Sequence, residues 1–130
     1  MRLKSLNVLV VDDDAENLDL LSLCLASEGA HVLSAPSLAS ALVRIAQAPI
    51  DLVVCGLMLS DGDGCDLLQH LRAQPERRKV PAIALTLIPD REQWQELERC
   101  GFDGFAVIPV NLEDLVGSIV RLVRSTSGTA

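Results

Sequence analysis

The stretch Asp51-Leu-Val-Val-Cys-Gly-Leu-Met-Leu-Ser-Asp-Gly-Asp-Gly64 decides the fold of this chain. Its first part, Leu52 to Cys55, is a short run of apolar residues, as expected of a strand buried on both faces of a parallel sheet. The Gly- and Asp-rich residues that follow favour a turn and the start of a helix. Ligands bind where such a strand ends, and the residue at that end is Gly56, which has no side chain to contribute.

The rest of the chain repeats this order of strand and then helix. Apolar segments predict strands at residues 6–11, 31–34, 52–55, 80–85 and 105–108. Each is followed by apolar residues at helical spacing, such as Leu18, Leu21 and Leu25 after the first strand. Strict alternation with short connections predicts an α/β fold, in which five helices flank a five-stranded parallel sheet.

Boundary residues fall where this pattern needs them. Asp14 is the expected N-cap of the first helix, and the third helix is expected to start near Asp63 and Gly64. Pro89 and Asp90 open the fourth helix, and Gly101 closes it. The small polar residues 125–130 predict a tail or linker, so we expect a single domain over residues 1–124.

Composition is that of one globular domain. The chain has 130 residues, of which 49% are hydrophobic and 22% charged, with a net charge of -7. Such an acidic domain is expected to repel nucleic acid and anionic membranes. No apolar run approaches the ~20 residues of a membrane span, and the N-terminus lacks the apolar region of a signal peptide. We therefore expect a cytoplasmic location.

Four cysteines, Cys24, Cys55, Cys65 and Cys100, are widely spaced and form no Cys-x-x-Cys pair. This spacing favours neither a zinc site nor a disulfide framework, and reduced, mostly buried thiols are expected. Cys65 lies near a predicted helix N-terminus, which lowers a thiol pKa, so a redox role is the alternative to an inert thiol there.

Carboxylates follow two of the predicted strands. Asp12, Asp13 and Asp14 come directly after the first strand, and Asp61 and Asp63 lie in the loop after the third. If these strands are neighbours, both loops open at one sheet edge and form a candidate Mg²⁺ site. The alternative is that Asp14 and Asp63 cap helices and Asp61 is a turn residue. Asp12 and Asp13 fit this alternative less well, because adjacent carboxylates repel unless a cation lies between them.

Taken together, these segments resemble the receiver domain of two-component response regulators, and the match covers essentially the whole chain. The matching stretches are Val8-Leu-Val-Val-Asp-Asp-Asp14, Asp51 to Gly64, Pro81-Ala-Ile-Ala-Leu-Thr86, and Gly101-Phe-Asp-Gly-Phe-Ala-Val-Ile-Pro109. The resemblance implies a flavodoxin-like sheet with strand order 2-1-3-4-5, an order for which a member of this family is a standard example.

The resemblance also implies a phosphorylation site. In the family, an acidic pair after the first strand holds Mg²⁺, and an aspartate ending the third strand accepts a phosphoryl group from a histidine kinase. A Thr or Ser ends the fourth strand, and a Lys precedes the Pro after the fifth. Asp12 and Asp13 match the acidic pair, Thr86 the hydroxyl, Phe105 the aromatic switch position on the fifth strand, and Pro109 the Pro.

Two central positions of that site depart from the family pattern. The acceptor aspartate falls on Gly56, which offers no carboxylate as nucleophile, and the lysine falls on Ile108, which cannot neutralise a phosphoryl group. The complete site carries a net charge of about -2, and Asp12 with Asp13 alone also give about -2, so the two losses balance. The third Mg²⁺ ligand is lost with the acceptor, so we expect no cofactor and at most weak Mg²⁺ binding.

These departures predict a degenerate receiver that is not an enzyme and acts as a phosphorylation-independent protein-interaction or dimerisation module. Its expected partner is a histidine kinase, an output domain or another receiver, with no direct nucleic-acid or membrane binding. One alternative is a phosphoacceptor that uses a displaced acid such as Asp61. Another is a receiver whose emptied pocket, between Gly56, Thr86 and Ile108, binds a small ligand.

Receiver domains commonly signal through the fourth helix, fifth strand and fifth helix, so a homodimer through this face is a further expectation. Trp94 is the single tryptophan and lies in the otherwise polar segment Arg91 to Glu96. Two interpretations stay open for it: an exposed interface anchor, or a ring packed beside Leu97 against the sheet.

Overall fold

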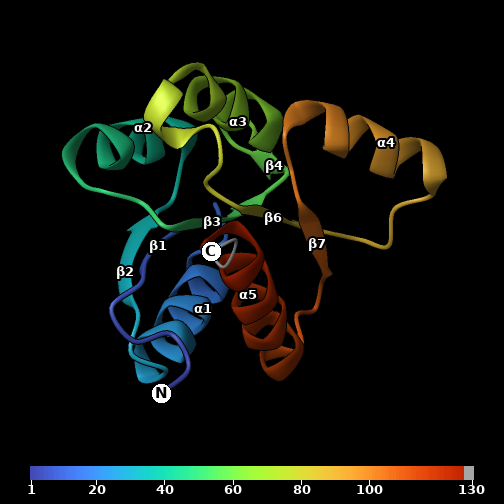
Figure 1. Ribbon diagram of the computed structural model, residues 1–130. Helices are drawn as coiled ribbons and strands as arrows, with labels where there is room; N and C mark the ends of the chain where they lie inside the picture. The colour runs from blue at the N-terminus through green and yellow to red at the C-terminus, as the bar shows by residue number, and fades with distance from the viewer. Residues whose placement is uncertain (128–130) are drawn as a thin grey trace.

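The computed structural model describes residues 1–127, and residues 128–130 lie outside the described part. Five parallel strands form one sheet in the order β2-β1-β3-β6-β7 (Figure 1). Because β6 and β7 are the fourth and fifth strands of this sheet, the order is the expected 2-1-3-4-5. The strands are β1 (Asn7–Val11), β2 (His31–Ala35), β3 (Leu52–Gly56), β6 (Ala82–Thr86) and β7 (Gly104–Val107).

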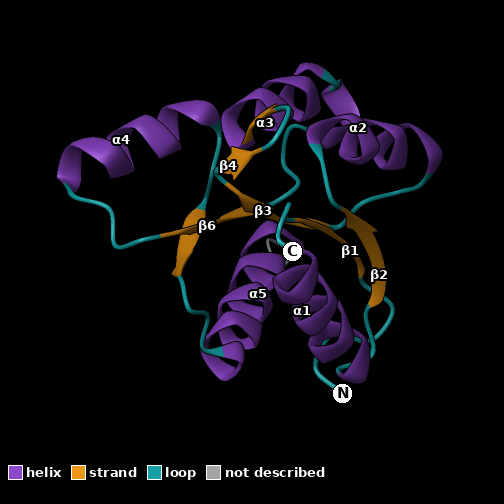
Figure 2. Ribbon diagram, turned by 180° about the vertical axis from the view of Figure 1, so that it is seen from behind, coloured by secondary structure: helices purple, strands orange, loops and turns teal. Residues whose placement is uncertain are grey.

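Five helices cover the two faces of the sheet, as predicted. On one face lie α1 (Ala15–Ser27) and α5 (Leu112–Ser127), and on the other lie α2 (Leu38–Gln47), α3 (Gly64–Ala73) and α4 (Arg91–Cys100) (Figure 2). The short 3-10 helix η1 (Pro75–Arg77) follows α3. Successive strand residues point to opposite faces, so Val8 and Val10 pack with α1 and α5, whereas Leu9 and Val11 pack under the other three helices.

Several helix ends lie at the predicted residues because side chains and glycine satisfy their exposed backbone groups. Asp14 accepts hydrogen bonds from the amides of Glu16 and Asn17 at the start of α1. Asp63 and Asp90 cap α3 and α4 in the same way. Gly101 ends α4 with φ +110°, a backbone conformation that favours glycine.

Two features of the fold differ from expectation. The loop after β3 contains a small antiparallel sheet, β4 (Met58–Leu59) paired with β5 (Gly62–Asp63), where only a turn was expected. The last helix runs to Ser127, past the boundary expected after residue 124. Ser and Thr cost only a few tenths of a kcal/mol within a helix, so the polar composition of residues 125–127 does not end α5. The rest of the expected tail, residues 128–130, lies outside the described residues.

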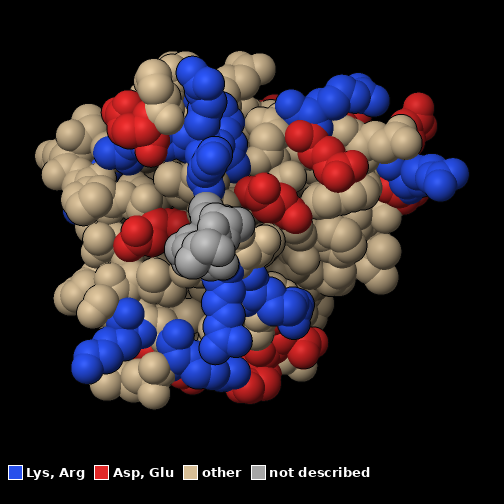
Figure 3. Space-filling view, viewed as in Figure 1, with Lys and Arg blue, Asp and Glu red and all other residues tan. Residues whose placement is uncertain are grey.

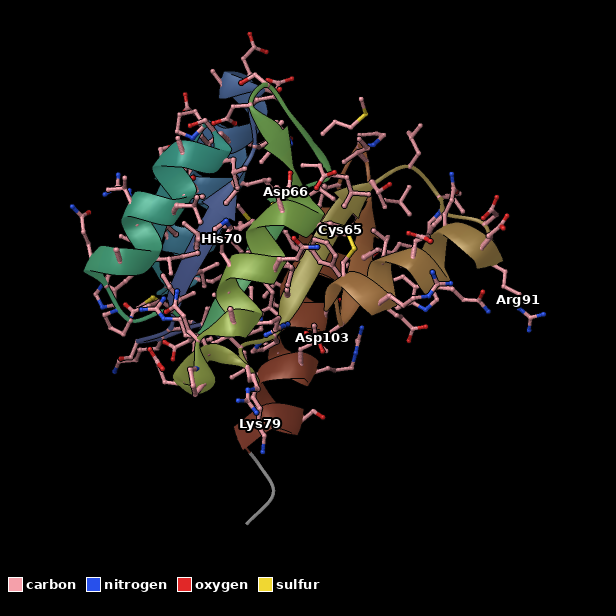
Figure 4. The ribbon with its side chains drawn as sticks, turned by 90° about the horizontal axis from the view of Figure 1, so that it is seen from above. Cys65, Asp66, His70, Lys79, Arg91 and Asp103 are labelled. Carbon is pink, nitrogen blue, oxygen red and sulfur yellow. A yellow bond between two sulfur atoms is a disulfide. The ribbon has the colours of Figure 1, made fainter. Side chains whose placement is uncertain are left out.

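The expectation of four reduced thiols is wrong, because Cys65 and Cys100 form a disulfide. Their Cα atoms are 5.3 Å apart, within the usual range for a disulfide. The bond joins the first turn of α3 to the last residue of α4, two helices that are neighbours on the same face (Figure 4). A separation of 35 residues in sequence gave no sign of this contact. Cys24 is a half-buried thiol and Cys55 a buried one.

The surface of the described residues carries both signs of charge. On the face shown in Figure 3, Lys and Arg side chains are bordered by Asp and Glu side chains. Among the helices described, none has both the length and the apolar character needed to cross a bilayer.

Candidate functional site

The ends of four parallel strands bring the predicted site residues to one edge of the sheet. Val11 pairs with Cys55, Gly56 with Leu85, and Thr86 with Val107. Asp12, Gly56, Thr86 and Ile108 therefore meet at this edge, and all four line a cavity of about 760 Å³. The sequence-based grouping of these residues is thus seen in the structure.

One wall of the cavity is formed by the acidic residues after β1. Asp12 is half-buried and held in place, because one of its oxygens accepts the Asp14 amide at 2.9 Å and the other accepts the Asn17 side-chain amide. Asp13 is exposed, also lines the cavity, and makes no hydrogen bond or ion pair within the described residues. Asp14 caps α1. Asp13 is therefore the carboxylate of this wall with no partner in the described part of the chain.

Packing does not require a glycine at position 56. A Cβ atom at this position would lie 3.6 Å from the Val11 carbonyl oxygen and 3.9 Å from Leu59 Cδ2, both ordinary contacts. Its φ lies outside the left-handed region that favours glycine. Space and backbone therefore accept a side chain where the family places its acceptor aspartate.

Thr86 and Ile108 complete the edge. The Ile108 amide donates to the Thr86 carbonyl at 2.9 Å, and the Ile108–Pro109 peptide bond is cis. Ile108 is 37% exposed and gives the cavity an apolar side chain at the position expected for lysine. The lining contains no Lys, Arg or His. The acidic wall therefore has no cationic counterpart within the cavity.

The residues present supply fewer carboxylates than the Mg²⁺ site that the receiver family implies. Asp12 and Asp13 supply two carboxylates, and Gly56 supplies none in place of the third. Across the part of the chain that the structure describes, no group of three or more His, Cys, Asp or Glu side chains is arranged to hold a metal ion. Mg²⁺ prefers carboxylates together with waters in octahedral geometry, and this set has one carboxylate fewer than the family pattern.

The second pair of candidate acids lies outside the cavity lining. Asp61 accepts hydrogen bonds from the Ala39 amide at 3.0 Å and the Leu38 amide at 2.8 Å. These bonds lower the pKa of Asp61. Asp61 therefore supports the start of α2, a role missed from the sequence because its partners lie 22 and 23 residues away. Asp63 caps α3, as one of the two interpretations held.

Cys55 lies at the end of β3, and its thiol is shielded from solvent. Burial, together with the charges of Asp12 and Asp63, raises the pKa of Cys55 to about 12. Its Sγ donates to the Gly56 carbonyl oxygen at 3.2 Å. A thiol with so high a pKa is neutral and is a poor nucleophile near neutral pH.

Trp94 is half-buried and packs against the core below α4, together with Leu97. Its ring also contacts Phe105 of β7, with ring centres 5.4 Å apart and an interplanar angle of 59°. This tilted geometry is favourable for aromatic pairs. The structure therefore favours the packed interpretation of Trp94, while Phe105 stays 40% exposed on the α4–β7–α5 face.

Comparison with known proteins places the whole arrangement in one family. Residues 8–120 match the response regulator receiver domain. An uncharacterised 14.6 kDa protein of Leptolyngbya boryana, encoded in the sodA1 3' region, is 35% identical over 94% of this chain and 90% of its own length. The transcriptional regulatory protein AruR of Pseudomonas aeruginosa is 32% identical over 90% of this chain, which spans only 49% of AruR.

Solved structures agree with this fold. A CheY-like receiver domain protein from Methanospirillum hungatei JF-1 superposes with a TM-score of 0.88 and 25% identity, over 98% of this chain and 100% of that one. A response regulator from Chloroflexus aurantiacus gives a TM-score of 0.85 and 27% identity, over 92% and 98% of the two chains. The chain belongs to the response regulator receiver family, whose members are signalling modules of two-component systems.

Proposed function

We propose that this receiver domain works as a phosphorylation-independent protein-interaction module and does not accept or release a phosphoryl group. The observation that carries the proposal is the pair Gly56 and Ile108. Both line the cavity at the strand ends, where the family pattern requires an aspartate and a lysine. An acyl phosphate needs a carboxylate nucleophile, and no packing constraint explains its replacement by Gly56.

The geometry of Asp61 argues against a displaced acceptor. Both of its oxygens accept backbone amides at the start of α2, and it does not line the cavity with Asp12 and Thr86. To act as a nucleophile there, Asp61 would have to leave this helix end. The same incomplete set of carboxylates supports weak Mg²⁺ binding by Asp12 and Asp13.

The surface proposed for partner binding is the α4–β7–α5 face. It exposes apolar side chains, with Phe105 40% and Val107 36% exposed. A shallow hollow of about 340 Å³ lies beside them, between β7 and the start of α5. A histidine kinase, an output domain or another receiver is the proposed partner. Receiver-like segments occur in a histidine kinase and in transcriptional regulators that this chain resembles. A homodimer through the same face is also proposed.

Sedimentation velocity, with and without a small phosphodonor and Mg²⁺, tests whether association is independent of phosphorylation. We expect the same association state with and without the phosphodonor. The variant Phe105→Ser is expected to weaken this association, and Leu23→Ser to leave it unchanged. Leu23 is an equally apolar but more exposed residue on α1, which does not belong to this face. An association state that appears only with the phosphodonor contradicts the proposal.

Restoring the lost chemistry is the complementary test. The double variant Gly56→Asp/Ile108→Lys is expected to gain one phosphoryl group from acetyl phosphate with Mg²⁺, because the space at Gly56 accepts a side chain and Asp12, Asp13 and Thr86 are in place. The measurement is the intact mass before and after treatment with hydroxylamine, which cleaves acyl phosphates. The control is the variant Gly56→Ala/Ile108→Lys. A phosphoryl mass gain on this control would show that an acid other than residue 56 is the acceptor.

A further inference from the structure

The cavity at the strand ends has the dimensions of a small-molecule site. Its volume of about 760 Å³ lies within the ~300–1,000 Å³ of typical ligand pockets. Its walls come from the ends of β1, β3, β6 and β7 and from Gln93 in the first turn of α4. Residues from several elements of the fold therefore form this site.

The acidic wall lacks a counter-ion. Asp12, Asp13 and Asp14 line the cavity, and no Lys, Arg or His does. Asp12 and Asp14 are already hydrogen-bonded to the start of α1, but Asp13 makes neither a hydrogen bond nor an ion pair in the described residues. Two adjacent carboxylates without a cation repel each other. The charge of this wall is therefore complementary to a ligand with a positive group.

The remaining walls present apolar side chains to solvent. Met58 is 85% exposed, Leu87 70% and Ile88 77%, and all three line the cavity with Ile108. Large apolar residues gathered at a cavity mark a surface that is covered when a ligand binds. A hydrated metal ion would leave this surface uncovered, and it would also lack the third carboxylate. An organic cation would pair its charge with the acidic wall and cover the apolar wall with its hydrocarbon part.

We propose that the cavity binds an amphipathic organic cation, with its ammonium or guanidinium group at Asp12 and Asp13 and its apolar body against Leu87 and Ile88. The inference rests on the proposed function in one respect, that the cavity takes no phosphoryl group. Binding of such a ligand would give this domain a small-molecule signal in place of phosphorylation. Met58, from the short strand β4, also belongs to this apolar surface.

The test uses dansylcadaverine, a primary ammonium joined by an alkyl chain to an aromatic body, and its N-acetyl derivative, which has the same body without the charge. Fluorescence titration of the full chain is expected to give saturable binding of the ammonium probe and at least about fivefold weaker binding of the acetylated one. Equal binding of both probes, or no binding of the ammonium probe to the wild type, overturns the proposal.

Matched variants locate the binding. Asp13→Asn is expected to weaken the ammonium probe about fivefold, whereas Asp19→Asn, an equal charge change on the exposed side of α1, leaves it unchanged. Ile88→Ser is expected to weaken it about fivefold, and Leu23→Ser to leave it unchanged. All four side chains are exposed, so circular dichroism is expected to show an intact fold.

Three further outcomes contradict the proposal: unchanged binding in Asp13→Asn, unchanged binding in Ile88→Ser, and displacement of the probe by micromolar Mg²⁺, which would indicate a metal site. A phosphoryl mass gain after phosphodonor treatment is a separate result. It would contradict the proposed function, whereas the probe titrations test the cation site alone.

Discussion

Gly56 and Gly64 lie at the two ends of the segment that contains β4 and β5, yet an added carbon atom meets different surroundings at each. At Gly64, in the first turn of α3, a Cβ would lie 2.9 Å from the Gly56 carbonyl oxygen and 3.2 Å from the Phe102 ring. Because a backbone oxygen cannot yield easily, we expect Gly64→Ala to lower the free energy of unfolding by about 1–3 kcal/mol.

Gly56→Ala is the matched control. Its Cβ would make only ordinary contacts, and alanine loses less conformational entropy than glycine on folding, so we expect a gain of about 0.5 kcal/mol or no change. Urea unfolding of both variants measures the difference. A loss at Gly56 as large as that at Gly64 would mean that packing, and not chemistry, explains the glycine at the acceptor position.

The two free thiols give a second prediction at this scale. Burial raises the pKa of Cys55 to about 12, and burial also raises the pKa of Cys24, which is more accessible. Because only the thiolate reacts with iodoacetamide, we expect slow labelling of Cys24 and none of Cys55 in the folded, unreduced protein. Peptide mass spectrometry checks the sites, and labelling of both thiols in urea is the control. Rapid labelling of Cys55 in the folded protein would contradict its burial.

Among the elements, α3 and α4 depend on the Cys65–Cys100 disulfide. The bond closes a segment with a sequence separation of 35 residues. Restricting the unfolded chain in this way is worth about 3–4 kcal/mol in the chain-entropy description. We therefore expect dithiothreitol to lower the free energy of unfolding by about that amount. In the double variant Cys65→Ala/Cys100→Ala, dithiothreitol is expected to leave the free energy of unfolding unchanged. If dithiothreitol lowered it as much as in the wild type, the effect would not come from the Cys65–Cys100 disulfide.

The start of α2 depends in turn on Asp61. The Ala39 and Leu38 amides lower the pKa of Asp61, so its carboxylate stabilises the folded state above the unfolded pKa of about 4 and loses this effect as the pH falls through the lower folded value. We expect Asp61→Asn to lower the melting temperature at pH 7 by about 3 °C, and by less at pH 3. Asp19→Asn is the control. A difference that is the same at both pH values would contradict the role of the charge.

For the whole molecule, the sequence predicted what is encoded locally. Strand and helix order, the cap Asp14, the helix starts near Asp63 and Asp90, and the end of α4 at Gly101 follow from short-range patterns and are confirmed. The strand order came from the family resemblance and is also confirmed. These signals place Asp12, Gly56, Thr86 and Ile108 at one edge of the sheet without any knowledge of the structure.

Features that depend on contacts between distant segments were not predictable in this way. The disulfide joins residues 35 apart, and Asp61 supports the start of a helix, more than twenty residues before it in the sequence. A pocket between Gly56, Thr86 and Ile108 was expected from the family resemblance, but the exposed apolar side chains of Met58, Leu87 and Ile88 around it were not. Their exposure is a property of the folded surface and has no periodic signal in the chain.

We propose that the receiver scaffold is kept in this protein while its phosphoryl chemistry is lost. The most direct measurement is the intact mass of the wild-type protein after incubation with acetyl phosphate and Mg²⁺, with Gly56→Asp/Ile108→Lys treated in parallel. We predict no phosphoryl adduct on the wild type. An adduct on the wild type that hydroxylamine removes would contradict this prediction, because it would identify an acyl phosphate on a carboxylate elsewhere in the chain, since Gly56 has none.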